Sequence, residues 1–251
     1  MKIITLLTDF GSFYPAQMKG VILAKVKDVT FVDIAHDIPS QDIRSGAFAL
    51  LSTARYFPQG TIHLAVVDPG VGTQRAGLVV ESGGQLFVGP DNGLLMPTAR
   101  SLGTPKAYKI DIKFESSMSH TFHGRDIFAP AAAMLALGGK PESLGPRIRP
   151  VDLGFGSARK TDLGLEATII YVDKFGNLVL NMRKLPAGPL ALKGIRLRQV
   201  NTYAEVKRIE PLITLGSHGF AEIAVNQGSA AEAFGLKAGD RIVLEESNCS
   251  E

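Results

Sequence analysis

The sequence predicts two domains, an α/β N-terminal domain built on a mainly parallel sheet and a small C-terminal antiparallel β domain, either a barrel or a sandwich. Three observations favour this division. Apolar strands and helical segments alternate through the first part, Gly and Pro interrupt the pattern between residues 138 and 160, and short strands dominate afterwards. We place the α/β domain at residues 1–150, a linker at 151–160 and the second domain at 161–251.

Strands are expected where a short apolar run ends at a turn, and helices where apolar residues recur with helical spacing. One helix opens at Ser40–Arg44, with Ser40 as the expected N-cap, and another is rich in alanine, a strong helix former. In the first domain we expect strands at 3–8, 29–34, 61–67, 77–81, 85–88 and 107–110, and helices at 16–25, 40–56 and 126–137. In the second we expect strands at 166–172, 176–181, 195–200, 220–225 and 241–245, and a short helix at 229–234.

The composition is that of an ordinary globular protein. Hydrophobic residues make up 45% and charged residues 20%, the net charge is only +3, and no basic stripe with interleaved aromatics is present. The longest small apolar run, 129–137, is far shorter than the roughly 20 residues of a membrane helix. We therefore expect neither a nucleic-acid nor a membrane partner. The lone cysteine, Cys249, and an N-terminus that reads as a strand and not as a signal peptide favour a soluble cytoplasmic protein.

Polar residues gather at four turns, each at the end of an apolar run or the start of a helix. In the first of these, Asp68 ends a buried run, Pro and Gly follow at once, and the turn returns to a guanidinium at Arg75. Open α/β sheets bind ligands at strand ends, so this turn is a candidate site. An ordinary turn with a surface ion pair is the alternative. The other three turns are Thr8–Gly11, Thr121–Asp126 and Asp173–Asn177.

These residues leave several chemistries open. A metal-dependent phosphoesterase would use oxygen and imidazole ligands at one sheet edge, although no ligand pair with a helical metal-site spacing is present. A Ser-His-Asp hydrolase is disfavoured because no Gly-x-Ser-x-Gly elbow occurs. A nucleoside-binding protein without catalytic activity is a third class, and a structural role for the histidine at 123 is a further alternative. The candidate ligands for the phosphoesterase are Asp9, Asp33, His36, Asp68 and His123.

Taken together, the four turns resemble those of the S-adenosylmethionine hydrolases (adenosine-forming), or hydroxide adenosyltransferases, which are related to the fluorinases and chlorinases. The resemblance covers nearly the whole chain. It implies an α/β N-terminal domain followed by a small antiparallel β-barrel domain, and a homotrimer that holds the nucleoside between the N-terminal domain of one subunit and the C-terminal domain of the next. The matching motifs are Thr8–Gly11, Val67–Gly72, Phe122–Asp126 and Asn226–Ser229.

The resemblance implies hydrolysis of S-adenosylmethionine to adenosine and methionine by substitution at ribose C5′, with no metal or other cofactor. The sulfonium is already an activated leaving group, so the protein must supply an aligned, desolvated water with hydroxide character. The family's residues for this task fall on Asp68, Arg75 and His123. Arg75 would hold the incoming oxygen, His123 would accept or relay its proton, and Asp68 would orient the pair. Halide-using relatives differ at these positions, so water is favoured over chloride or fluoride.

Several positions match the nucleoside-binding residues of the family. Asp9 matches the acid that accepts hydrogen bonds from the ribose hydroxyls. Asn177 matches an amide that reads the adenine edge as donor and acceptor together. Tyr203 and Phe220 match aromatic positions beside adenine, with ordinary barrel core as the alternative. Phe122, within its motif, joins this substrate-binding set.

The methionine end of the expected pocket departs from the family pattern. Asp173 matches an acid near the methionine ammonium, Ser217 matches a residue at the methionine carboxylate, and Asn226 is expected to bind substrate within its motif. The loop at 12–16 is shorter than usual and lacks an acid that the family carries there. His218 stands where some relatives have an arginine, and an imidazole holds a carboxylate less firmly than a guanidinium does.

Overall fold

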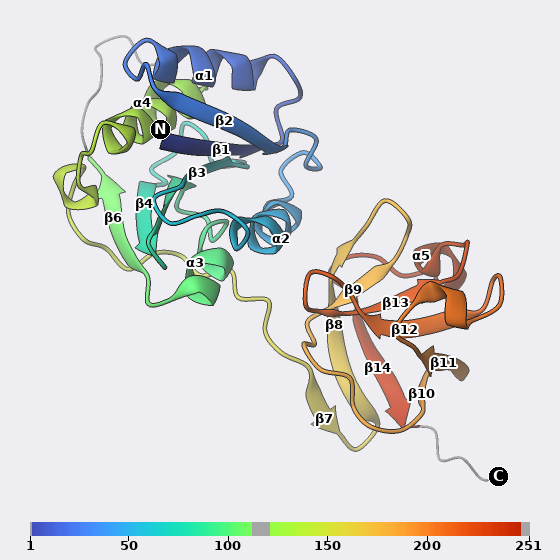
Figure 1. The fold of residues 1–251 in the computed structure, drawn as a ribbon. Helices are drawn as coiled ribbons and strands as arrows, with labels where there is room; N and C mark the ends of the chain where they lie inside the picture. The colour runs from blue at the N-terminus through green and yellow to red at the C-terminus, as the bar shows by residue number, and fades with distance from the viewer. Residues whose placement is uncertain (1, 112–120, 247–251) are drawn as a thin grey trace. The chain divides into compact units, whose positions relative to one another are not determined.

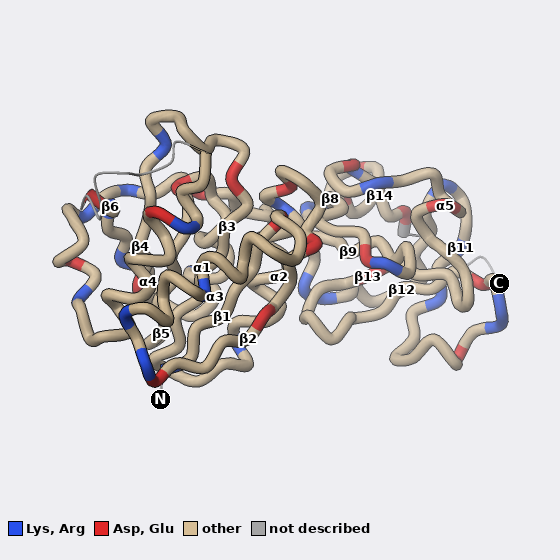
Figure 2. The backbone as a smooth tube through the Cα atoms, turned by 90° about the horizontal axis from the view of Figure 1, so that it is seen from above, with Lys and Arg blue, Asp and Glu red and all other residues tan. Residues whose placement is uncertain are grey.

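The computed structural model describes residues 2–111 and 121–246 and divides into two compact units, Met1–Gly154 and Phe155–Glu251 (Figure 1). Cys249 lies outside the described residues. Lys and Arg are interspersed with Asp and Glu along the backbone of both units (Figure 2). None of the helices in the described ranges is long and apolar enough to cross a bilayer.

The first unit is built on a six-stranded, mostly parallel sheet, which confirms the predicted α/β fold. Its strand order is β2-β1-β3-β5-β4-β6, and only β4 runs antiparallel to its neighbours. The central strand β3 is buried along its whole length because a parallel sheet is covered on both faces. The strands are β1 (Lys2–Thr8), β2 (Val29–Ala35), β3 (Ile62–Val66), β4 (Gly77–Ser82), β5 (Gln85–Pro90) and β6 (Lys106–Ile110).

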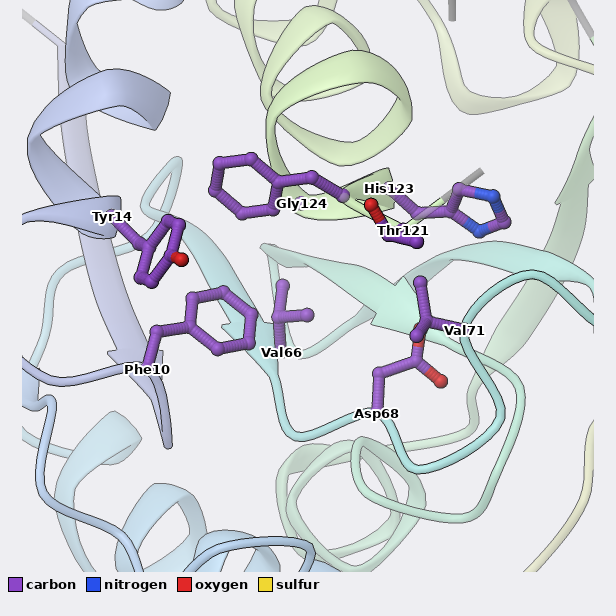
Figure 3. A pocket seen from close by; sticks show the side chains of 9 residues that line it. Phe10, Tyr14, Val66, Asp68, Val71, Thr121, His123 and Gly124 are labelled. Atoms are coloured by element: carbon purple, nitrogen blue, oxygen red, sulfur yellow. The ribbon is translucent and has the colours of Figure 1, made fainter. Parts of the chain in front are cut away.

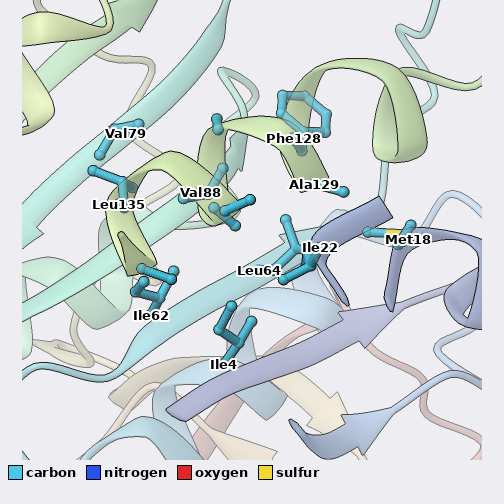
Figure 4. Close-up of a cluster of buried hydrophobic side chains, with 14 of the residues drawn as sticks. Ile4, Met18, Ile22, Ile62, Leu64, Val79, Val88, Phe128, Ala129 and Leu135 are labelled. Carbon is cyan, nitrogen blue, oxygen red and sulfur yellow. The ribbon is translucent and has the colours of Figure 1, made fainter. Parts of the chain in front are cut away.

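Helices cover both faces of this sheet (Figure 1). On one face, Met18 and Ile22 of α1 and the alanines of α4 pack with Ile4 and Leu64 of the strands (Figure 4). On the other face Gly46 of α2 lies so close to neighbouring side chains that a Cβ there would be 3.0 Å from two of them. The helical elements are α1 (Tyr14–Leu23), α2 (Ile43–Ala54), α3 (Met96–Leu102), the π-helical turn η1 (Gly124–Phe128), α4 (Ala129–Ala136) and the 3₁₀ turn η2 (Pro141–Ser143).

The start of α2 corrects one expectation. The N-cap is Asp42 and not Ser40, because the Asp42 carboxylate accepts hydrogen bonds from the Ser45 N–H at 3.0 Å and the Ser45 hydroxyl at 2.5 Å. Gln41 has a φ of 65°, so the chain is still turning one residue before the cap. The short helix α3 was not expected, since seven residues carry too little periodicity to be recognised.

The second unit contains a closed barrel of seven strands, because β14 pairs with both β10 and β8, and β7 extends the sheet beyond β8. The expected wholly antiparallel barrel is wrong in one place, since β11 and β12 run parallel. The long connection between them, residues 200–210, lets the chain cross back instead of turning in a hairpin. The elements are β7 (Arg159–Thr161), β8 (Gly164–Val172), β9 (Leu178–Leu180), β10 (Leu190–Leu192), β11 (Ile195–Gln199), η3 (Tyr203–Glu205), β12 (Pro211–Leu215), β13 (Ala221–Val225), α5 (Ala230–Phe234) and β14 (Arg241–Glu246).

Strand β13 has two different faces. Ala221 and Ile223 point into the core of the barrel with residues of β8, β9 and β14. Alternate residues of a strand point to opposite sides, so Glu222 and Ala224 lie on the outer face. That face is covered, because Ala224 packs with Val200 and other residues around the long connection, and Glu222 is only 5% exposed. A carboxylate is therefore buried between the barrel wall and the connection.

Candidate active site

The structure brings Asp68, Arg75 and His123 into contact. Asp68 follows β3, and the turn of small residues after it returns Arg75 to the same point. Arg75 Nη2 donates to Asp68 Oδ2 at 2.5 Å and lies 3.1 Å from His123 Nδ1. Arg75 Nη1 donates to the Ala76 carbonyl at 2.8 Å, and its guanidinium lies over the Phe128 ring at 5.3 Å. The guanidinium thus has four partners, which hold it in place.

The carboxylate and the guanidinium form a buried ion pair, with side chains only 4% and 9% exposed. Burial raises the pKa of Asp68, and the charge and the hydrogen bond of Arg75 oppose this rise without cancelling it. Among the described residues, Asp68 Oδ1 makes no hydrogen bond of ordinary geometry. Asp68 is therefore a stronger proton acceptor than an ordinary aspartate, with one oxygen available for a further donor.

The contact between Arg75 and His123 determines where the imidazole carries its proton. A guanidinium has only N–H donors, so His123 Nδ1 must be the acceptor in this contact. The proton of the neutral ring is therefore on Nε2. A second proton on Nδ1 would point at a fixed positive charge. This arrangement makes His123 a support for Arg75 more readily than a proton acceptor on that nitrogen.

A cavity of about 320 Å³ lies beside these residues. Figure 3 shows Asp68 and Val71 on one side of it and the rings of Phe10 and Tyr14 on the other. Phe122 packs edge to face against both rings, with centroid distances of 5.8 and 5.2 Å. The cavity thus combines an apolar, aromatic wall with the carboxyl group of Asp68 and the imidazole of His123. Its lining residues are Phe10, Tyr14, Val66, Asp68, Val71, Thr121, Phe122, His123 and Gly124.

The close approach around Gly124 shapes this cavity. A Cβ at Gly124 would lie 3.0 Å from Phe122 and 3.3 Å from both Met18 and Phe10. The π-helical turn η1 begins at this glycine, directly after His123. Turns of this kind interrupt regular helices and often occur at functional sites. The missing side chain lets the aromatic wall and the start of η1 come together.

Asp9 directly precedes the lining residue Phe10 but does not itself line the cavity. Its Oδ2 accepts a hydrogen bond from the Gln41 N–H at 2.8 Å. The preceding Thr8 hydroxyl is 2.9 Å from His36 Nδ1, and the Gly11 N–H donates to the His36 carbonyl at 2.9 Å. These contacts hold the turn after β1, and none of them uses the second carboxylate oxygen of Asp9.

The five residues considered as metal ligands separate into different clusters. Asp33 pairs with Lys19 at 2.6 Å and lies 3.0 Å from His36, while Asp68 pairs with Arg75. Within residues 2–111 and 121–246 no group of three or more His, Cys, Asp or Glu side chains is arranged to hold a metal ion. The geometry at Asp68 is that of an ion pair with a guanidinium.

In the second unit, three of the expected binding residues form a connected group. Asp173 Oδ1 accepts from the N–H groups of Phe175 and Asn177, both at 2.9 Å, which closes the turn after β8. Asn177 Nδ2 donates to Asp173 Oδ2 at 2.9 Å and lies 3.5 Å from Tyr203 Oη. Tyr203 donates to the buried Glu222. Burial, followed by the hydrogen bond to Glu222, raises the pKa of Tyr203.

The residues around 217–220 are held by contacts within the barrel. His218 Nδ1 accepts from the Phe220 N–H at 3.2 Å, so its proton is on Nε2, which lies 3.0 Å from Glu222 Oε2. Both ring nitrogens thus have partners inside the protein. Phe220 is buried, with the Arg183 guanidinium 4.1 Å from its ring centre. Ser217 lies in the same turn.

Asn226 makes contacts that stabilise the long connection between β11 and β12. Its side-chain Nδ2 donates to the Val206 carbonyl at 2.9 Å. Its backbone N–H donates to the Glu210 carbonyl at 3.1 Å, and its carbonyl accepts from the Ile209 N–H at 2.8 Å. The described contacts of Asn226 therefore hold the segment that carries Tyr203.

Sequence reasoning missed several residues that the structure places at these two locations. Phe10 belongs to a recognised motif and Tyr14 to the loop that follows it, but nothing in their spacing showed that they line a cavity. Glu222 did leave a signal, because it is the one charged residue in the apolar strand Ala221–Val225. A charge in such a strand is buried only if it is paired.

Comparison with known proteins relates both units to one family. Residues 4–145 match the SAM hydroxide adenosyltransferase N-terminal domain, and residues 167–243 match the C-terminal domain of the same family. An (R)-S-adenosyl-L-methionine hydrolase of Thermus thermophilus is 41% identical, over 95% of this chain and 98% of that protein. A more distant relative, a fluorinase of Nocardia brasiliensis, is 27% identical over 94% of each chain. The crystal structure of an uncharacterised conserved protein from Thermotoga maritima has a TM-score of 0.86 and 31% identity, over 96% of this chain and 99% of that one.

Proposed function

The chain belongs to the SAM hydroxide adenosyltransferase family, and we propose on this basis that it hydrolyses S-adenosyl-L-methionine to adenosine and L-methionine. It is an adenosine-forming hydrolase that acts on the bond between the sulfonium and ribose C5′. The name of the Thermus relative specifies the R configuration, and we propose the same preference for this chain. The observation that carries the proposal is the contact of Asp68, Arg75 and His123 beside an aromatic-walled cavity.

The reaction needs one water and one departing thioether. A bond forms between the water oxygen and C5′ as the bond between C5′ and sulfur breaks. Sulfur keeps the bonding pair and leaves as neutral methionine, and the water loses one proton. Because the leaving group is already cationic, the barrier lies in aligning the water and removing its competing solvation. The rings of Phe10, Tyr14 and Phe122 would exclude bulk water, and aromatic faces favour a nearby cation.

We assign the proton to Asp68. Its raised pKa makes it a better acceptor than an ordinary aspartate, and Oδ1 has no ordinary hydrogen bond among the described residues. Arg75 would stabilise negative charge that develops on the water oxygen. His123, whose Nδ1 faces Arg75, would hold the guanidinium in place. This differs from the role expected from the sequence, in which His123 accepted or relayed the proton.

The substrate needs no cofactor for this chemistry, and we propose that S-adenosylmethionine is bound without one. Asn177, Tyr203 and Phe220 of the second unit would bind adenine, and Asp173 and Ser217 would bind the methionine part. Asp9 and Phe122 of the first unit would lie at the ribose. We propose a homotrimer in which the first unit of one subunit and the second unit of the next share each site. A cytoplasmic location stays a prediction from the sequence.

An isotope experiment tests this function directly. The purified chain is incubated with the R and S forms of S-adenosylmethionine in ¹⁸O-labelled water, and products are identified by mass spectrometry. We expect adenosine labelled at the 5′ oxygen, together with methionine, and faster turnover of the R form. The same reaction in fluoride or chloride should yield no halogenated adenosine.

Two controls make the result decisive. Asp68→Asn should abolish most of the turnover while adenosine still binds, and Glu81→Gln, which changes an exposed carboxylate paired with Lys106, should leave turnover unchanged. Tight binding of S-adenosylmethionine with no product would favour the nucleoside-binding protein instead. Adenosine formed without ¹⁸O would refute direct attack by water on C5′.

A further inference from the structure

Glu222 is a buried carboxylate for which the reaction gives no role. It is 5% exposed on the outer face of β13, where Tyr203 Oη donates to Oε1 and His218 Nε2 lies 3.0 Å from Oε2. Burial acts to raise the pKa of Glu222, but the hydrogen bonds from His218 and Tyr203 outweigh it and leave the pKa lowered. Glu222 is therefore ionised at neutral pH, and an ionised carboxylate only accepts hydrogen bonds.

This acceptor determines the direction of a short chain of hydrogen bonds. Because Glu222 can only accept, the Tyr203 hydroxyl must use its single proton on it. Tyr203 Oη is then an acceptor toward Asn177 Nδ2, at 3.5 Å. At the other end Asp173, also a carboxylate, accepts from the same Nδ2 at 2.9 Å. The two carboxylates thus determine which group donates and which accepts in each hydrogen bond between Asp173 and Glu222.

The amide of Asn177 is the group that this polarity controls. Asn177 Nδ2 donates one proton to Asp173 and the other to Tyr203. A flip of the amide by about 180° would place its oxygen against the Asp173 carboxylate, and two acceptors would then face each other. Among the described residues no hydrogen-bond donor to Asn177 Oδ1 is found. Asn177 therefore presents an acceptor, and not the donor and acceptor together that the sequence led us to expect.

We propose that Glu222 is a positioning residue that acts through Tyr203 to hold Asn177 as a hydrogen-bond acceptor, and so selects purines with an exocyclic amino group over purines with an oxo group. This rests on the proposed function, because it assumes that Asn177 contacts the base. Adenine offers the donor that Oδ1 requires. Hypoxanthine offers an oxygen at the same place, so two acceptors would meet, and a site built around one hydrogen bond rejects such an analogue.

Replacing Glu222 by glutamine would remove this control with almost no change of shape. His218 Nε2–H still needs an acceptor, so the new amide oxygen would stay at His218 and the new NH₂ group would face Tyr203. Tyr203 would then accept from residue 222, and its own proton would turn toward Asn177. Tyr203→Phe breaks the same chain by removing the hydroxyl.

The test compares adenosine with inosine, in which an oxo group replaces the exocyclic amino group and N1 carries a proton. Binding of each nucleoside to the full-length protein is measured by calorimetry, and turnover is measured with S-adenosylmethionine and its inosine counterpart. We expect wild type to favour adenosine by about 100-fold or more, and Glu222→Gln and Tyr203→Phe each to reduce that ratio about tenfold, mainly through KM. Glu166→Gln, at a carboxylate paired with Arg159 in the same barrel, should leave the ratio unchanged.

The outcomes separate this inference from the proposed function. A wild-type protein that binds both nucleosides equally, or a folded Glu222→Gln variant that keeps the full ratio, would overturn the role of Glu222 even if S-adenosylmethionine is hydrolysed. Loss of selectivity in Tyr203→Phe supports it even if Glu222→Gln fails to fold. Selective binding of adenosine that both variants lose, without any turnover, supports the inference while refuting the hydrolase.

Discussion

Lowering the pH should destabilise the first unit through one buried histidine, His63. This residue lies in the centre of the sheet on β3, has no exposed surface, and stacks on Phe87 with ring centres 4.9 Å apart. Its Nδ1 is 2.8 Å from the Thr5 hydroxyl and its Nε2 is 3.1 Å from Gln85 Oε1. The Gln85 amide nitrogen donates to backbone carbonyls, which leaves its oxygen facing the ring. The neutral form of His63 therefore carries its proton on Nε2.

The size of the effect follows from the difference in pKa between the folded and unfolded chain. Burial lowers the pKa of His63 from 6.5 to about 4. The unfolded chain takes up a proton as the pH falls below 6.5, whereas the folded chain does so only near pH 4. The contribution of His63 to stability is thus complete above the unfolded pKa and is lost as the pH falls through the folded pKa. The lost free energy of unfolding amounts to about 3 kcal/mol.

This loss is measured by urea unfolding of wild type and His63→Phe at several pH values between about 7.5 and 4. That range includes the pKa of His63 in both the unfolded and the folded chain. His63→Phe leaves Thr5 and Gln85 without their partner, which lowers the free energy of unfolding by the same amount at every pH. The comparison therefore uses the change of that free energy with pH and not its absolute value. Other titrating groups contribute to both proteins and cancel in the difference. Wild type should lose about 3 kcal/mol more than the variant. Equal slopes, or an NMR titration of folded His63 near 6.5, would refute the reasoning.

Four further outcomes follow from the two sites. Asp68→Asn should lower kcat by about 100- to 1,000-fold, which steady-state kinetics would show. Asp68→Ala should also lower the free energy of unfolding by about 3–5 kcal/mol, because it leaves Arg75 buried without its partner, and urea unfolding would measure this. Mixing inactive Asp68→Asn and Asn177→Ala subunits should restore about a quarter of wild-type activity if neighbouring subunits share a site, and none if each subunit has its own. Gly176→Ala should destabilise the second unit by more than about 1 kcal/mol, since φ is +81° and the new Cβ would lie 2.1 Å from Ser229 Oγ; thermal unfolding measures this. Treatment with a chelator should leave turnover unchanged, and a loss restored by a divalent ion would favour the metal-dependent phosphoesterase.

Much of the fold was predictable because strands and helices have local signals. The apolar run at Ile62–Val66 and the alanine-rich segment before residue 137 need no distant partner to be recognised. Errors arose where a choice between neighbours depends on geometry. Ser40 and Asp42 are both good N-caps, and only the backbone path through Gln41 selects Asp42. The parallel pairing of β11 with β12 likewise depends on where a long connection returns.

The candidate site shows the same division between local and long-range information. Asp68 and Arg75 are seven residues apart, so a single turn of small residues was enough to suggest that they meet. His123 is 48 residues from Arg75, and its place rested on the family motif until the structure put Nδ1 against the guanidinium. Because of that contact we propose that His123 supports Arg75, whereas the family resemblance led us to expect that it accepts or relays the proton.

By itself the sequence determined the family, the order of most elements and the residue types available for chemistry, because motifs, periodicity and turn residues are properties of short segments. Only the tertiary structure decided which atoms donate and which accept. The acceptor presented by Asn177 depends on carboxylates at Asp173 and Glu222, one in its own turn and one on a distant strand. The direction of each hydrogen bond depends on all the partners that a group has, and these partners come together only when the barrel has formed.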